Sequence, residues 1–484
     1  MLDYDLVIIG DTSTAIQAAL AATTFPARVA LVQSETVGFA SPSGLNAIHG
    51  LSQVGECLQQ LHRAPQFGIS SSGGDLELNL HEAIHWINGV VANLEEQNAS
   101  TILTSLGIDV ITGTGHFVNK PHLAFLVNGR HLRGLRYLLA PGTQPRVPEI
   151  DGLTDMNYLT SRSLAQWFTS VTSEENDWHQ LPQRWVIIGG NPAGIEFAQT
   201  LVRLGKSVTL VLRQSHLLSQ EEPEAAFLIQ NCLEAEGVRV LTNTSVMQAK
   251  MIQGQKWIQV GNEAIETDEI FLATGEVPQV DSLNLEAVGV QNNGQRLQLN
   301  SKLQTTNSRI YACGDVAGGY PFPHIAAYEA KVAVKNALLS PIYPADYSTI
   351  PWAIFADPQL ARVGLTEAQA RRRYGEKVQV YQHHFKTLDK AVITDEILGF
   401  CKLITDEKDK ILGATVVGAQ ATELISTIAL AMNHKISLEK LAQQCQISPS
   451  FTEIIGQTVA GEPKHHPWYN LLDNLFHWRR YWFS

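Results

Sequence analysis

The chain has 484 residues, of which 44% are hydrophobic and 17% charged, so it is a globular protein with more than one hydrophobic core. A formal net charge of -12 and a pI of about 5.7 argue against a nucleic-acid binder, which usually carries a basic domain. The five cysteines include no C-x-x-C pair and no metal-ligand spacing. They predict a reducing compartment, no disulfide framework and no bound metal.

The N-terminus starts with a strand pattern almost at once, without a basic region or a cleavage site. The chain has no run of 18 apolar residues, so no membrane-spanning helix is expected. A cytoplasmic location is therefore the prediction.

Two segments of the chain share one β-α-β pattern. Residues 5–10 (DLVIIG) form an apolar run that ends in glycine, followed by a helical pattern and a second apolar run at 29–32. The same order recurs over residues 185–212. Continuous apolar runs are typical of strands that are buried on both faces of a parallel sheet. We therefore predict an α/β fold with two Rossmann-like dinucleotide-binding domains.

Between the two units, residues 78–106 read as a helical insertion, followed by strand patterns near 108–118 and 123–139. Residues 136–148 and 269–278 each read as a strand that ends in a Gly/Pro loop. We expect these two segments to be partners, at which the chain crosses from one domain to another.

The pattern changes after residue 345. Residues 350–416 are rich in strand patterns, and 420–445 are helical. This arrangement predicts a separate C-terminal α+β domain.

Each β-α-β unit has a loop in which a Rossmann turn would place three glycines, one for the turn, one for phosphate approach and one for helix packing. The helix that follows directs its N-terminus at the phosphates. In chain order, the residues at these places are Gly10, Thr12 and Ala15 in the first unit and Gly189, Asn191 and Gly194 in the second.

Longer segments carry a family resemblance. IYACGDVAGGYPFPHIAAYEAKVAVKNAL (310–338) resembles the flavin-binding segment of the pyridine nucleotide–disulfide oxidoreductases, especially the dihydrolipoamide dehydrogenase and mercuric reductase branch. GGNPAGIEFAQTLVRLGKSVTLV (189–211) and FLATGEVP (271–278) are similar to successive blocks of that family. PWAIFADPQLARVGLTEAQA (351–370) looks like its dimerisation domain. The resemblance covers about residues 5–465.

The resemblance implies a homodimer that binds FAD and NAD(P)H. It also implies a domain layout. The FAD domain would comprise 1–150 and 276–345, the NAD(P)H domain 151–275, the dimerisation domain 346–465, and an added tail 466–484.

The resemblance also assigns cofactor-binding residues. For FAD they are Gly10, Thr12, Ser13, Gln33, Ser34, Gly115, Pro141, Gly142, Gly314 and Asp315. For the nicotinamide nucleotide they are Gly189, Asn191, Gly194, Glu196, Arg213 and Gly275. Asp315 matches the aspartate that bonds the ribityl chain of the flavin, and the plain alternative is an aspartate that forms a turn.

Two of these residues are expected to weaken the binding of FAD. Gln33 stands where an acidic residue would hold the ribose hydroxyls, and an amide bonds them without charge assistance. Thr12 narrows the room for the pyrophosphate. Two outcomes are open: the chain binds FAD with altered contacts, or it has lost FAD and kept only the fold. The preserved Gly314–Asp315 segment favours bound FAD.

The chain departs from the family where the family does its chemistry. A C-x4-C pair and a lysine are expected near residues 37–51, but Ser41 and Asn46 stand at the cysteine spacing, and no lysine occurs between Gln33 and Cys57. Serine and asparagine cannot form a disulfide. The catalytic site of a disulfide reductase is therefore predicted to be absent.

The family's C-terminal histidine is also replaced. Ser448 stands at its position, followed by the family's proline and by Glu453. A serine hydroxyl cannot replace imidazole as a base near neutral pH. The catalytic residues of this chain are thus unknown from sequence.

The choice of nicotinamide nucleotide leans to NADPH. Leu212 stands where an NAD site usually has a carboxylate, and Arg213, which suits a 2′-phosphate, follows it. A solvated loop arginine is the alternative. Glu196 lacks its usual lysine partner, so we expect either an altered pKa or a new partner.

The last twenty residues are rich in aromatic side chains, with Arg479 and Arg480 among them. Such a tail suits a membrane interface or the groove of a protein partner, and a tail folded back on its own dimer is equally open. A peripheral location at a membrane follows from the first reading. The aromatic residues are Trp468, Tyr469, Phe476, Trp478, Tyr481, Trp482 and Phe483.

Two functions are compatible with these features. The first is an enzyme that passes electrons from NADPH through FAD to a quinone or another small, non-disulfide acceptor. The second is a non-catalytic dimeric scaffold or nucleotide sensor that binds a partner or a membrane through its tail.

Overall fold

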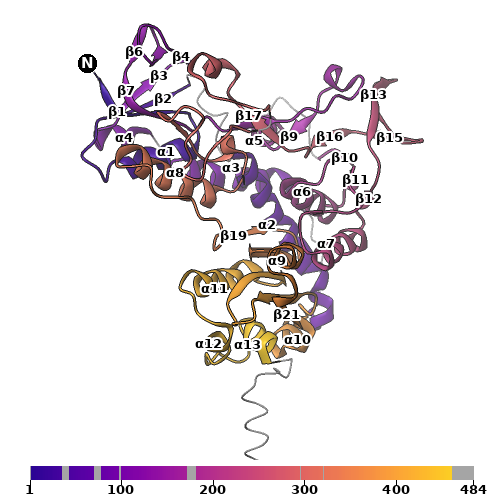
Figure 1. The fold of residues 1–484 in the computed structure, drawn as a ribbon. Coiled ribbons are helices and arrows are strands. Elements are labelled where there is room, and N and C mark those ends of the chain that lie inside the picture. The colour runs from indigo at the N-terminus through magenta and orange to yellow at the C-terminus, as the bar shows by residue number, and fades with distance from the viewer. Residues whose placement is uncertain are drawn as a thin grey trace, which may run out of the picture. The chain divides into compact units, whose positions relative to one another are not determined.

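The computed structural model describes residues 2–34, 43–69, 78–96, 100–171, 181–294, 296–319 and 321–460. Ser41 and the aromatic tail lie outside these residues. The chain divides into two compact units, of which the first comprises Met1–Ser219 and Gln230–Asp346, and the second Gln220–Ile229 and Tyr347–Ser484. Figure 1 labels their elements.

A parallel five-stranded sheet contains the first β-α-β unit. Both neighbours of β1, which are β2 and β7, run parallel to it, as the apolar runs predict. In spatial order the strands are β18 (Ile310–Ala312), β7 (Gly134–Leu139), β1 (Tyr4–Ile9), β2 (Val29–Gln33) and β3 (Asp109–Thr112).

Strand β1 is buried on both faces. Leu6 and Ile8 belong to a core with the alanines of α1 (Ser13–Ala22) and α8 (Pro323–Leu338). Val7 and Ile9 belong to a second core with aromatic residues of a three-stranded antiparallel sheet. That sheet comprises β4 (Gly115–Val118), β5 (Ala124–Val127) and β6 (Arg130–Leu132).

The second β-α-β unit lies in another parallel sheet. Strand β10 pairs with β11 and β16, and α6 (Pro192–Arg203) connects β10 to β11. In spatial order the strands are β12 (Arg239–Leu241), β11 (Ser207–Val211), β10 (Arg184–Ile188), β16 (Glu269–Leu272) and β9 (Leu159–Thr160). An antiparallel sheet packs against it through a shared core and comprises β13 (Val246–Ile252), β14 (Gln255–Val260) and β15 (Glu263–Thr267).

The helical insertion predicted for residues 78–106 is confirmed as α3 (Leu80–Glu96) and α4 (Ser100–Ser105). Helix α2 (Ser43–Arg63) was not anticipated, and it begins within residues 37–51, the segment in which the family's cysteine pair was sought. Helix α2 packs against α3, α5 (Leu164–Val171) and α6.

The two segments expected to be partners do meet. Strand β8 (Thr143–Pro145) pairs antiparallel with β17 (Glu276–Pro278), with Thr143 opposite Pro278. This pairing confirms that the two strand ends lie together.

The second unit contains an antiparallel sheet, which confirms the strands predicted for residues 350–416. In spatial order they are β19 (Pro351–Ile354), β20 (Gln359–Gly364), β23 (Ile411–Gly418), β22 (Phe400–Thr405) and β21 (Gln379–His384). The predicted helical stretch is confirmed as α11 (Ala421–Asn433) and α12 (Leu438–Ala442), whereas α9 (Glu367–Tyr374) and α10 (Asp389–Thr394) were not anticipated.

The remaining helices are α7 (Pro223–Glu236) and α13 (Glu453–Ala460). Short 3-10 helices are η1 (Ala64–Phe67), η2 (Leu153–Asp155), η3 (Asp281–Leu283), η4 (Leu285–Val288), η5 (Asp315–Ala317), η6 (Gly375–Lys377) and η7 (Phe385–Thr387). Among the residues described, no helix is long and apolar enough to cross a membrane.

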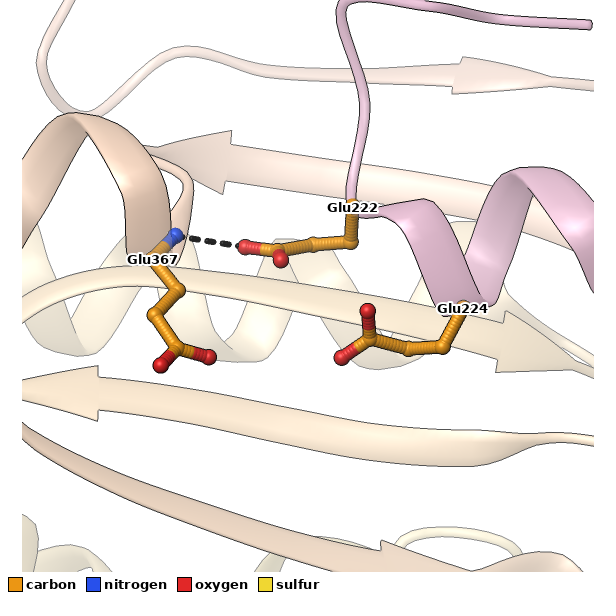
Figure 2. Close-up of side chains that lie close together, drawn as sticks. All are labelled: Glu222, Glu224 and Glu367. Carbon is orange, nitrogen blue, oxygen red and sulfur yellow. Dashed lines mark hydrogen bonds between the residues drawn. The ribbon is translucent and has the colours of Figure 1, made fainter. Parts of the chain in front are cut away.

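A buried ionic cluster lies within the second unit. Glu222, Glu224 and Glu367 place carboxylate oxygens within 4.8 Å of one another, a spacing that could hold a metal ion (Figure 2). The ammonium of Lys402 contacts all three carboxylates at 2.9, 2.5 and 2.7 Å. The cation of this cluster is therefore a lysine side chain.

The charge of Lys402 is held firmly in this cluster. Its side chain is 3% exposed, and burial alone would lower its pKa, but the carboxylates of Glu224, Glu367 and Glu222 outweigh burial and raise it. Glu222 also accepts a hydrogen bond from the backbone N–H of Glu367, the first residue of α9, at 2.6 Å (Figure 2). A carboxylate there is further stabilised by the dipole of the helix.

We expect Lys402→Met to destabilise the second unit by about 3–5 kcal/mol, because it leaves carboxylates buried without their cation. Lys377→Met is the matched control, since Lys377 forms an exposed pair with Glu407 and should cost under about 1 kcal/mol. Hydrogen exchange of the amides in β20, β22 and β23 would measure the opening free energy. Similar losses in the two variants would contradict this account.

Candidate functional site

The first glycine loop has the close backbone approach that the motif predicts. Gly10 follows β1 with φ +148, and a Cβ there would clash with the carbonyl oxygen of Ala140. Ala140 in turn donates its N–H to the carbonyl of Ile9 at 2.8 Å. A side chain at residue 10 would therefore force the end of β1 away from the end of β7.

Thr12 is the N-cap of α1. Its hydroxyl accepts a hydrogen bond from the N–H of Ala15 at 3.2 Å and donates one to the carbonyl of Ala140 at 2.8 Å. Its methyl group lies 2.8 Å from where a Cβ of Gly142 would stand. The hydroxyl of Thr12 thus caps the N-terminus of α1, but its methyl group occupies the space that a glycine would leave for a phosphate.

Four of the predicted FAD residues line one pocket, which has a volume of about 100 Å³. They are Thr12, Ser13, Gly142 and Asp315. Helix α2 contributes its first turn through Gly44 and Leu45. The charged side chains in the lining, besides Asp315, are Glu276 and Arg162.

Asp315 begins the 3-10 helix η5 after Gly314, whose φ of +75 and closeness to the Thr14 side chain exclude a larger residue. Burial, with the negative charges of Glu276 and Glu329, raises the pKa of Asp315 from 3.8 to about 6. Glu329 is itself 2% exposed and accepts a hydrogen bond from the N–H of Gly314 at 2.7 Å. Asp315 is therefore partly protonated near neutral pH.

The other predicted FAD residues are not among those that line this pocket. Gln33 and Ser34 lie at the end of β2, and Pro141 follows Ala140 beside Gly10. Gly115 is the first residue of β4, and a Cβ there would clash with the ring of Phe125. Gly115 therefore has a packing role that the sequence did not indicate.

The second glycine loop repeats the geometry of the first. Gly189 has φ +99, and a Cβ there would clash with the carbonyl oxygen of Ala273. Asn191 is the N-cap of α6 and accepts the N–H of Gly194 at 2.9 Å. A Cβ on Gly194 would lie 2.5 Å from the Cβ of Ala273, so this glycine lets α6 pack closely on β16.

The end of β11 differs from an NAD-type site. Leu212 is 2% exposed, and its side chain lies 2.6 Å from where a Cβ of Gly190 would stand. An apolar group thus lies beside the loop. Arg213 is exposed and makes no ion pair with any residue that the structure describes. Gly275 has φ +89 at the junction of β16 and β17.

Glu196 has a new partner, as the sequence analysis allowed. Its side chain is 3% exposed on α6, and its Oε2 lies 3.2 Å from Nε2 of His49 on α2. Sequence reasoning missed His49 because the search in this segment was for a lysine. A helix beginning at Ser43 would have drawn attention to this histidine.

Of the residues expected at the family's catalytic positions, the structure describes Asn46, Ser448 and Glu453. Asn46 lies on α2, and all five cysteines of the chain are free. Ser448 is exposed, and Glu453 accepts the backbone N–H of Ser450 at 2.8 Å. The carboxylate that the resemblance assigns to orienting a histidine here caps the start of α13.

The family model of the pyridine nucleotide-disulphide oxidoreductases matches residues 4–330, and the model of their dimerisation domain matches residues 350–459. The chain belongs to this family. Its members are NAD(P)H-dependent flavoprotein oxidoreductases, FAD is their expected cofactor, and the dimerisation domain supports a homodimer.

Curated relatives match over most of their length. A mercuric reductase from Lysinibacillus sphaericus is 30% identical over 95% of this chain and 82% of its own. A dihydrolipoyl dehydrogenase from Bacillus subtilis is 27% identical over 94% of this chain and 97% of its own.

Solved structures share the fold. The Cu(II) complex of the HOCl-induced flavoprotein disulfide reductase RclA from Escherichia coli superimposes with a TM-score of 0.79, at 25% identity over 96% of this chain and 100% of that one. LpdA from Mycobacterium tuberculosis reaches 0.82, at 23% identity over 94% and 99%.

The described residues fit FAD except at Thr12. The Gly10 loop, the first-turn N–H groups of α1 and the buried carboxyl of Asp315 suit a dinucleotide with a hydroxylated chain. The methyl group of Thr12 beside Gly142 crowds the path of the pyrophosphate. The backbone of the Gly10 loop keeps the expected conformation. The side chain of Thr12 is therefore what differs from a typical FAD site.

We expect Asp315→Asn to remove a pH dependence of stability. With the pKa of Asp315 raised to about 6, ionisation disfavours the folded state, so the penalty is absent below about pH 4, grows between about pH 4 and 6, and is constant above that range. Between pH 4 and pH 7, the unfolding free energy of the wild type should fall by at most about 3 kcal/mol relative to that of Asp315→Asn. This figure corresponds to a difference of about two between the pKa of Asp315 in the folded state and in the unfolded state.

Urea unfolding of the flavin-free protein across this pH range would measure the difference. Glu276→Gln should shrink it, because the charge of Glu276 contributes to the raised pKa of Asp315. A wild type whose unfolding free energy runs parallel to that of Asp315→Asn would refute the assignment.

Proposed function

We propose that the chain oxidises NADPH and passes the electrons through FAD to a small acceptor that is not a disulfide, with a quinone as the first candidate. The observation that carries this proposal is that both glycine loops keep their backbone geometry, whereas no cysteine precedes Cys57. A bound flavin would accept and release hydride, and the protein would hold the two nucleotides and the acceptor.

The domain layout and binding residues belong to the same proposal. We assign FAD to residues 1–150 and 276–345, NADPH to 151–275, and dimerisation to 346–465. Gly10, Ser13, Gly142 and Asp315 would hold FAD, with Gly189, Asn191, Gly194 and Arg213 on NADPH. The backbone N–H groups and the arginine would meet phosphates, and Asp315 would bond a hydroxyl.

The relatives suggest which acceptors to include. The curated relatives with 30% identity are named for mercuric ion, and RclA has been solved as a Cu(II) complex, both unaltered and as a cysteine-to-serine mutant. Metal ions therefore belong in a panel with a benzoquinone and ferricyanide. A lipoyl disulfide is the negative control, because no cysteine precedes Cys57 and the family's cysteine pair is expected before it.

The first test is an anaerobic titration of the purified protein with NADPH, followed by its absorption spectrum. We expect a flavin band that bleaches with NADPH and returns when a quinone is added, with no turnover of a lipoyl disulfide. A flavin band that never bleaches with NADPH or NADH would overturn the proposal.

The competing proposal is a non-catalytic dimeric scaffold or nucleotide sensor. The methyl group of Thr12 beside Gly142 favours it, because it narrows the first dinucleotide loop. Protein that purifies without flavin and binds no added FAD would support the scaffold. Its partner would then be sought with the tail, residues 466–484, present and deleted.

The NADPH preference predicts a specific kinetic effect. Arg213→Ala should raise the KM for NADPH about tenfold or more, since a charge-assisted bond to the 2′-phosphate is lost, and should leave the KM for NADH unchanged. Arg239→Ala is the matched control, because Arg239 is exposed in the same sheet and pairs with Glu263. Equal effects on both nucleotides would count against the NADPH site.

A further inference from the structure

The pair formed by His49 and Glu196 spans two environments. Glu196 is 3% exposed, whereas the side chain of His49 is 42% exposed, and Oε2 of the former lies 3.2 Å from Nε2 of the latter. A buried carboxylate is stable when it is paired. The imidazole ring therefore links a buried negative charge with solvent.

Helix α2 connects this pair with elements of both glycine loops. Its first turn, at Gly44 and Leu45, lines the pocket that contains Thr12 and Asp315. His49 lies five residues beyond Gly44, or about 7 Å along the helix axis. There it meets α6, the helix that begins at the Asn191 cap of the second loop.

We infer that His49, oriented by Glu196, is the proton donor to the acceptor, an inference that rests on the proposed function. Reduction of a quinone to a hydroquinone requires two electrons and two protons. NADPH supplies a hydride equivalent, which is two electrons and one proton, and leaves as NADP⁺. The second proton comes from the imidazolium of His49 and goes to a quinone oxygen.

The contact with Glu196 fixes where the ring lies. Nε2 of His49 is 3.2 Å from Oε2 of Glu196, so the carboxylate holds the ring beside α6 while 42% of the histidine side chain stays exposed. In the proposed step an N–H bond of the protonated ring breaks, a quinone O–H bond forms, and the neutral ring then takes a proton from water on its exposed side. Glu196 is a positioning residue.

The test compares an acceptor that needs protons with one that does not. The full-length flavin-containing protein would be assayed with a benzoquinone and with ferricyanide, which accepts single electrons without protons. His49→Gln should lower quinone turnover on the order of 100-fold, within the usual range for a general acid, and change ferricyanide turnover less than about twofold. Glu196→Gln should lower the ratio of quinone turnover to ferricyanide turnover by a smaller factor than His49→Gln.

The matched control is His62→Gln, an exposed histidine on the same helix, which should leave both rates unchanged. Two measurements independent of turnover accompany it. Nitrogen NMR of the His49 ring should show an Nε2 resonance that shifts in Glu196→Gln, because the carboxylate 3.2 Å away is replaced by a neutral amide. The affinity for NADP⁺ should change less than about threefold in His49→Gln, which shows that the nucleotide site is intact.

Equal losses with both acceptors, or no loss with either, would overturn proton donation by His49. If the wild type reduces neither acceptor, the proposed function itself is wrong, and the proton-donor role is then wrong as well. A selective loss with quinone, an intact NADP⁺ site and the NMR signature of the pair together support the inference.

Discussion

The fold depends on one repeated contact, in which the glycine that ends a parallel strand lies against a carbonyl at the end of the neighbouring strand. Gly10 meets Ala140, and Gly189 meets Ala273, each with a positive φ. Each contact brings a helix N-terminus to the carboxyl end of a sheet, where a dinucleotide can bind. Any side chain at either glycine would push the strand ends apart, so these two positions fix both loops.

A second constraint is that each buried carboxylate needs a partner. Glu222 has Lys402, Glu196 has His49, and Glu329 accepts the N–H of Gly314. Desolvation makes these charges costly alone, and a compensating group offsets the cost. The partner also determines the consequence, because lysine fixes a permanent charge, whereas histidine can release a proton near neutral pH.

Local patterns in the sequence predicted the parts of the fold that local physics determines. The apolar runs at 5–10 and 185–190 predicted strands buried on both faces, and the glycine spacing predicted the two loops. Helix α2 was missed, because residues 37–51 were interpreted only as a replaced active-site segment and the residues after them were given no element. Helices α9 and α10 were missed because they interrupt a strand-rich region. Pairs such as His49 with Glu196 are far apart in sequence, and no local pattern encodes them because only the packing of the helices brings them together. Thr12 shows the same limit, since its cap on Ala15 is local, but its closeness to Gly142 depends on the fold.

A separation of backbone and side-chain roles would let such a chain keep its nucleotide sites and change its acceptor, as we propose. Both glycine loops are built from glycine conformations and from backbone carbonyls, which tolerate almost no substitution. The proposed chemistry of the acceptor depends instead on a few side chains of one helix, where Asn46 stands at the spacing of a cysteine. His49 lies on that same helix, about one turn beyond the residues that line the pocket, so a change of side chains on α2 could alter the acceptor and leave both loops unchanged.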